Sequence, residues 1–83
     1  MKQELVYVVD DDEAVRDGLK QLLKSIKIKT SLFPDAKSFI KGYESDPKPG
    51  CLLLDIRMPG MSGLELQREI TIRKWDIPII FIT

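Results

Sequence analysis

Apolar and polar residues along the chain follow two alternating patterns. Four short runs are continuously apolar, or alternate between apolar and polar residues, which is typical of β-strands. These runs are residues 5–9, 28–32, 51–54 and 79–82. Between them, apolar residues recur every three or four positions, which is typical of amphipathic helices. These segments are residues 15–26, 36–43 and 62–73. Strands that alternate with helices of this length predict βαβ units and a mostly parallel sheet of the α/β class.

Local signals mark where the helices begin. Asp12 precedes the first helical segment, and Asp35 follows Pro34 directly before the second, so both are candidate N-caps. Ser62 has a glutamate three residues later, Glu65, which is the spacing of a capping box. We therefore expect the third helix to begin just after Ser62.

The same pattern predicts how deeply each element is buried. The runs at residues 5–9 and 51–54 lack polar alternation, so we expect strands that are buried on both faces, with Cys51 as a small buried residue. The run at residues 28–32 alternates with lysines, including Lys29, which is typical of an edge strand. Gly18 lies on the apolar face of the first helix, so we expect it to allow close approach to a neighbouring element.

Composition narrows the class of protein. The 83 residues carry 13 Lys+Arg and 13 Asp+Glu. This zero net charge argues against non-specific nucleic-acid binding that is driven by overall charge. The length predicts one domain, residues 1–83. A single cysteine excludes an internal disulfide. We find no apolar run long enough for a membrane span and no signal peptide pattern, so we expect a cytoplasmic protein.

Chemistry-bearing side chains follow the predicted strands. Asp10 and Asp11 follow the first strand, Asp55 follows the third, and Thr83 follows the fourth. In an open parallel sheet, functional sites lie outside the carboxyl ends of the strands. If the first and third strands are neighbours, three carboxylates converge, and we expect no Lys or Arg nearby to balance them. Such a set of oxygen ligands favours a hard divalent cation such as Mg²⁺.

A structural role is the simpler interpretation for any one of these aspartates alone. An aspartate after a strand is often a helix cap or a turn residue, and Asp10 or Asp12 would serve the first helix in that way. Asp55 is harder to explain as a helix cap, because the six residues after it do not have a helical pattern. The metal-site hypothesis therefore depends on the joint placement of the acids at two strand ends.

Three segments resemble the signatures of response-regulator receiver domains. They are residues 8–12 (VVDDD), 53–63 (LLDIRMPGMSG) and 78–83 (PIIFIT). The chain is most similar to receivers of the FixJ type, whose proteins carry a helix-turn-helix output domain. The resemblance implies a flavodoxin-like sheet with strand order 2-1-3-4 and a phosphoacceptor in a two-component system.

The resemblance also implies a role for each site residue. Asp55 would be the phosphoacceptor. Asp10, Asp11, Asp55 and the backbone carbonyl of Arg57 would bind Mg²⁺ or Mn²⁺. Thr83 would hydrogen-bond the phosphoryl group and move on activation. The implied partner is a sensor histidine kinase.

The sequence departs from the receiver pattern at its end. Receivers continue with a fourth helix, a fifth strand bearing a lysine, and a fifth helix, and the 83 residues include none of them. The chain thus resembles the first two-thirds of a receiver, and we expect its phosphorylation to be slow or absent without that lysine. The uncovered fourth strand and first helix lead us to expect a homodimer or higher assembly. DNA would be reached only through an output domain that these residues lack.

Two other functions are compatible with the same fold. One is a receiver-like interaction module that never receives phosphate, which the acidic pair and Asp55 argue against and the missing lysine argues for. The other is a flavin or nucleotide binder, which would need a Gly- or Ser/Thr-rich phosphate loop after the first strand. Three aspartates stand there instead.

Overall fold

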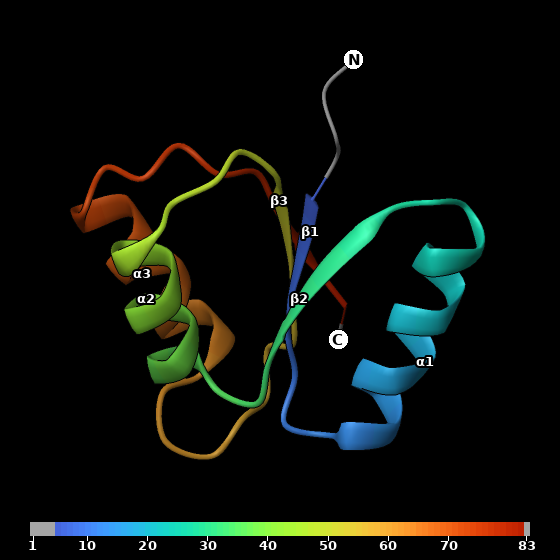
Figure 1. Cartoon of the computed structure of the whole chain (residues 1–83). Coiled ribbons are helices and arrows are strands. Elements are labelled where there is room, and N and C mark those ends of the chain that lie inside the picture. The colour runs from blue at the N-terminus through green and yellow to red at the C-terminus, as the bar shows by residue number, and fades with distance from the viewer. Residues whose placement is uncertain (1–4, 83) are drawn as a thin grey trace.

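Strands and helices alternate along the chain as the apolar pattern predicts. The computed structural model describes residues 5–82 (Figure 1). The strands are β1 (Leu5–Val9), β2 (Lys29–Phe33), β3 (Cys51–Leu54) and β4 (Ile79–Phe81). The helices are α1 (Glu13–Ser25), α2 (Ala36–Ser45) and α3 (Gly63–Ile72). All strand pairs are parallel, and the order is β2-β1-β3-β4, so the flavodoxin-like order 2-1-3-4 is confirmed.

The helix caps form where the sequence places them. The Asp12 side chain accepts hydrogen bonds from the backbone N–H groups of Ala14 and Val15 at the start of α1. Asp35 caps α2, and Ser62 and Glu65 form the complete capping box of α3. These three predictions are confirmed because each cap depends only on residues within one turn of it.

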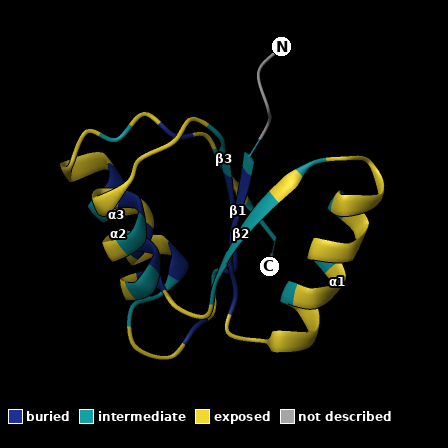
Figure 2. Ribbon diagram, viewed as in Figure 1, coloured by how far each residue is buried: buried dark blue, intermediate teal, exposed yellow. Residues whose placement is uncertain are grey.

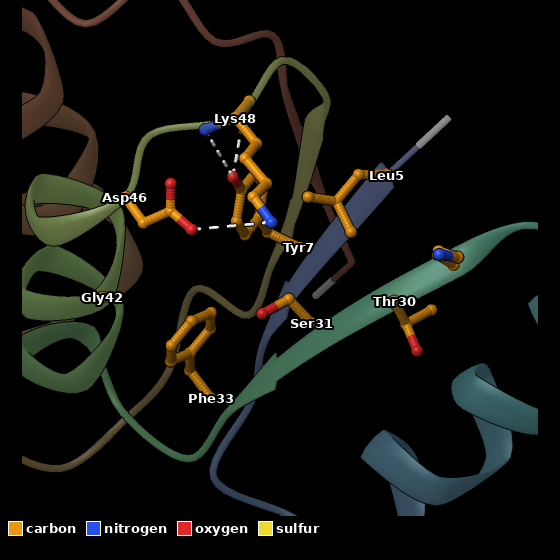
Figure 3. Close-up of a pocket in the computed structure, with 9 residues that line it drawn as sticks. Leu5, Tyr7, Thr30, Ser31, Phe33, Gly42, Asp46 and Lys48 are labelled. Atoms are coloured by element: carbon orange, nitrogen blue, oxygen red, sulfur yellow. Dashed lines mark hydrogen bonds and ion pairs between the residues drawn. The ribbon is translucent and has the colours of Figure 1, made fainter. Parts of the chain in front are cut away.

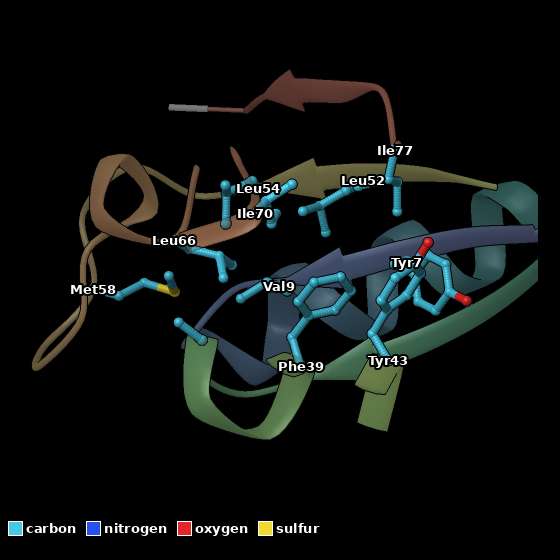
Figure 4. Close-up of a cluster of buried hydrophobic side chains, with 11 residues drawn as sticks. Tyr7, Val9, Phe39, Tyr43, Leu52, Leu54, Met58, Leu66, Ile70 and Ile77 are labelled. Carbon is cyan, nitrogen blue, oxygen red and sulfur yellow. The ribbon is translucent and has the colours of Figure 1, made fainter. Parts of the chain in front are cut away.

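The hydrophobic core lies between the sheet and helices α2 and α3 (Figure 4). Alternate residues of the two central strands, such as Tyr7 and Leu54, point to this face because side chains alternate along a strand. Phe39 of α2 and Leu66 of α3 are fully buried against them. This packing anchors the two central strands whose carboxyl ends carry the candidate site.

Within residues 5–82, α1 is the one helix on the opposite face of the sheet, where it packs against β2 (Figures 1 and 2). No residue of α1 is buried, and Leu22 is 61% exposed. Two predictions are wrong here. Cys51 and Leu53 are only half-buried, because α1 packs mainly against β2 on this face. Nothing lies within 4 Å of the position that a Cβ on Gly18 would take, so Gly18 makes no close approach.

The outer edge of β2 lines an open depression beside α2 (Figure 3). The Tyr7 hydroxyl donates to the backbone carbonyl of Lys48 at 2.9 Å and accepts from its N–H at 3.1 Å. These two bonds fasten the loop between α2 and β3 to the sheet. Asp10, Asp11, Asp55 and Arg57 do not line this depression. Among residues 5–82, no helix has both the length and the apolar character needed to cross a membrane.

Candidate functional site

Three carboxylates meet at the carboxyl ends of β1 and β3. The two strands are neighbours in the sheet, with Val9 opposite Leu54. The Asp55 N–H donates to the Val9 carbonyl at 3.0 Å, which places Asp55 beside the residues that follow β1. Each of Asp10, Asp11 and Asp55 offers a carboxylate oxygen, and these oxygens all lie within 4.8 Å of one another. The structure therefore brings together the acids that the sequence analysis singles out.

Two of the three carboxylates are buried. Asp10 is 6% exposed and Asp55 is 8% exposed, whereas Asp11 is exposed. Burial raises the pKa of the Asp10 carboxyl above its ordinary value, and the charge of Asp55 acts in the same direction, while a hydrogen bond from Asp12 opposes them. A raised pKa means that the folded state binds the Asp10 proton more tightly than the unfolded state. The free energy of unfolding therefore falls as the pH rises through this pKa and Asp10 ionises.

Backbone N–H groups hold the two buried carboxylates in place. Asp10 Oδ1 accepts from the Asp12 N–H at 2.8 Å, and Asp55 Oδ1 accepts from the Arg57 N–H at 3.2 Å. The cap interpretation applies to Asp12, which begins α1. Asp10 and Asp55 instead make turns within their own loops. Both carboxylates are thus oriented at the strand ends without serving as a helix N-cap.

Arg57 and Thr83 are the other two residues that the sequence analysis predicts for this site. Arg57 is placed by its N–H bond to Asp55, and the metal-binding role of its carbonyl stays a prediction. Thr83 lies outside the described residues.

Arg16 is a residue of this site that the sequence analysis missed. Its Nη1 donates to the backbone carbonyl of Asp10 at 2.7 Å. The expectation that no Lys or Arg comes near the acids is therefore wrong. The sequence offers only a partial signal in its spacing, because Arg16 follows the capping Asp12 by four residues, and its N–H donates to the Asp12 carbonyl at 3.1 Å. Side chains in helices lean toward the N-terminus, so an arginine there can reach back to the loop.

Gly63 packs the start of α3 directly against the backbone of Asp55. The Gly63 N–H donates to the Ile56 carbonyl at 2.9 Å. A Cβ at this position would overlap the Asp55 carbonyl oxygen and lie 2.9 Å from the Ile56 Cα. A residue without a side chain is therefore required here for the helix to support the loop that carries Asp55.

The donor set fits a hard divalent cation. All three clustered side chains offer oxygen, and the cluster contains neither sulfur nor imidazole. A divalent cation would offset the mutual repulsion of the carboxylates and the burial of Asp10. Mg²⁺ or Mn²⁺ is therefore the chemistry that these residues suit.

Comparison with known proteins identifies the family. The family description "Response regulator receiver domain" matches residues 6–83. The response regulator protein TmoT of Ectopseudomonas mendocina is 42% identical over 82 residues, which is 99% of this chain and 37% of TmoT. The transcriptional regulatory protein FixJ of Bradyrhizobium diazoefficiens is 39% identical over 82 residues, which is 94% of this chain and 38% of FixJ. The chain thus spans less than two-fifths of either relative.

A solved structure shows the same fold. The response regulator TrrA from Thermotoga maritima, in complex with Mg²⁺ and BeF, superposes with a TM-score of 0.86 and 33% sequence identity. The match covers 95% of this chain and 68% of the TrrA chain. With the family match over residues 6–83, this agreement shows that the chain belongs to the response-regulator receiver domain family of two-component systems.

Proposed function

We propose that the chain accepts a phosphoryl group on Asp55 from a sensor histidine kinase and switches a transcriptional output in the cytoplasm. The observation that carries this proposal is the convergence of Asp10, Asp11 and Asp55 at neighbouring strand ends. Its support is membership of the receiver family, together with relatives that are response regulators. The protein would act as a phosphoacceptor that assists its own phosphotransfer and dephosphorylation.

Asp55 supplies the nucleophile of this proposed reaction. One carboxylate oxygen attacks the phosphorus of a phosphohistidine, the phosphorus–nitrogen bond breaks, and the imidazole leaves with the bonding electron pair. The product on this chain is an acyl phosphate. The Arg57 N–H holds Asp55 Oδ1 at 3.2 Å, so the carboxylate is oriented before the donor arrives.

A divalent cation at the site would neutralise negative charge on the phosphoryl oxygens during transfer. Asp10, Asp11, Asp55 and the Arg57 carbonyl would hold it. The Thr83 hydroxyl would donate to the phosphoryl group and move on activation. The roles of Arg57 and Thr83 rest on the resemblance of residues 53–63 and 78–83 to receiver signatures.

The test of the metal site is paramagnetic broadening. Adding Mn²⁺ to the 83-residue chain should broaden the amide resonances that follow β1 and β3. The double variant Asp11→Asn with Asp55→Asn should lose this effect, because two of the three clustered carboxylates become neutral. The matched control is Asp46→Asn with Asp76→Asn. These two aspartates precede β3 and β4, so they lie toward the amino ends of the strands, whereas the candidate site lies at the carboxyl ends. Equal broadening in the site variant and the wild type would contradict the assignment.

The uncovered face of the sheet supports a proposal on assembly. Ile80 of β4 is 54% exposed, and Leu22 of α1 is 61% exposed. Ile80 lies on the sheet face that α1 covers only in part, and Leu22 lies on α1 itself. Within the described residues, β4 is also an edge strand. An apolar edge strand is a template for pairing, so we propose that the 83-residue chain self-associates through β4 or α1.

Sedimentation of the 83-residue chain at micromolar concentration tests this assembly. We expect a dimer or larger species, and we expect Ile80→Lys to shift the population toward monomer by placing a charge in the contact. Ile72→Lys is the control, because Ile72 is 64% exposed on α3, on the other side of the sheet. A monomeric wild-type chain with a cooperative thermal transition would contradict the proposal.

A further inference from the structure

We propose that Arg16 is a positioning residue for the metal site, which aims the carboxylate of Asp11 by fixing the peptide between Asp10 and Asp11. This inference rests on the proposed function, because it assumes that Asp11 binds the cation. It assigns a task to the guanidinium that donates to the backbone carbonyl of Asp10.

The contact is made to the backbone that carries Asp11. Arg16 Nη1 lies 2.7 Å from the Asp10 carbonyl oxygen, which belongs to the peptide joining Asp10 to Asp11. A hydrogen bond from an ionised donor is short and about twice as strong as a neutral one. Fixing the carbonyl oxygen fixes the plane of that peptide, since the peptide bond is rigid. The position of the Asp11 Cα follows from it.

Asp11 depends on this backbone contact more than its neighbours do. The Asp10 carboxylate is held by the Asp12 N–H, and the Asp55 carboxylate is held by the Arg57 N–H. Among the hydrogen bonds of residues 5–82, none is made by the carboxylate of Asp11, which is exposed. Its direction is therefore set mainly by its own backbone.

The first turn of α1 closes this arrangement. Asp12 caps the helix, and its carbonyl accepts from the Arg16 N–H at 3.1 Å. Arg16 is thus fastened to the loop at its backbone and again at its guanidinium. A lysine at this position would keep the charge but would present an ammonium on a flexible stem in place of the planar fork.

Position and charge predict opposite effects on metal affinity. A cation beside three carboxylates repels a bound divalent ion, so removing it would tighten binding if charge were its only contribution. Loss of a residue that orients a metal ligand typically weakens metal binding about 10-fold or more. Measuring the affinity of a neutral variant at high salt, where charge effects are screened, separates the two contributions.

The experiment compares Arg16→Met, Arg16→Lys and the control Lys20→Met in the 83-residue chain. Lys20→Met removes one positive charge from α1 a turn further from the site. The first readout, without metal, is the ¹⁵N shift of Asp11, which reports hydrogen bonding at the Asp10 carbonyl. The second is Mn²⁺ affinity, measured from paramagnetic broadening at high salt.

We expect Arg16→Met to shift the Asp11 ¹⁵N resonance and to weaken Mn²⁺ binding about 10-fold. Arg16→Lys should fall between Arg16→Met and the wild type, and Lys20→Met should match the wild type. Unchanged or tighter binding in Arg16→Met, or an unmoved Asp11 resonance, would overturn this inference while leaving the metal site intact. Absence of Mn²⁺ broadening in the wild type would overturn the proposed metal site itself.

Discussion

Replacing Asp55 with asparagine should abolish phosphorylation of the full-length protein. The asparagine side chain would keep the size of the aspartate but would lack the carboxylate oxygen that forms the acyl phosphate. With acetyl phosphate and Mg²⁺, the wild type should gain a phosphate that hydroxylamine removes, as measured by intact mass. The Asp55→Asn variant should gain none. Beryllofluoride with Mg²⁺ should likewise shift the amide resonances around residue 55 in the wild type alone.

The control for this result is Asp12→Asn. Asp12 lies in the same acidic run but caps α1, and asparagine caps a helix about as well as aspartate. This variant should therefore still be phosphorylated. An acid-stable phosphate on Ser62 or Thr83 would contradict the acyl-phosphate mechanism. A wild-type native protein that gains no phosphate at all would favour the alternative, an interaction module that works through its surface without phosphorylation.

Features of this protein that depend on nearby residues were predictable from the sequence. The strands are found within one or two residues of the apolar runs, because a strand that is buried needs apolar side chains in succession. The capping box of Ser62 and Glu65 follows from their three-residue spacing. The clustering of Asp10 and Asp55 also followed, because parallel strands place their carboxyl ends at one edge.

Features that depend on how far one element extends over another were not predictable. The apolar face of α1 has the periodicity of a buried helix, yet α1 covers only part of the sheet, so its residues stay accessible. Gly18 was misinterpreted for the same reason. Arg16 was missed because its role depends on a guanidinium reaching back to the Asp10 carbonyl, and residue type and spacing alone do not show that reach.

Gly63 links the fold to the site, so its replacement by alanine should affect both. The added Cβ would overlap the Asp55 carbonyl and approach the Ile56 Cα to 2.9 Å. The nearest atoms belong to the backbone of Asp55 and Ile56, so no flexible group can move aside, and such overpacking costs about 1–3 kcal/mol. We expect the free energy of unfolding, measured with urea, to fall by about 2–3 kcal/mol. Mn²⁺ binding should weaken as well, because the shifted helix displaces Asp55.

Gly18→Ala is the matched control for Gly63→Ala. Nothing lies within 4 Å of the Cβ that this substitution adds, and Gly18 is an exposed residue in the middle of α1. Alanine is favoured over glycine there by about 1 kcal/mol, so this variant should be more stable than the wild type, with unchanged Mn²⁺ binding. The same chemical change would thus have opposite effects at two helix positions. Suppose instead that Gly63→Ala unfolded at the same urea concentration as the wild type. The loop that carries Asp55 would then have accommodated the added Cβ without any loss of stability. The close packing of the helix against the candidate phosphoacceptor would then not be what holds that residue in place.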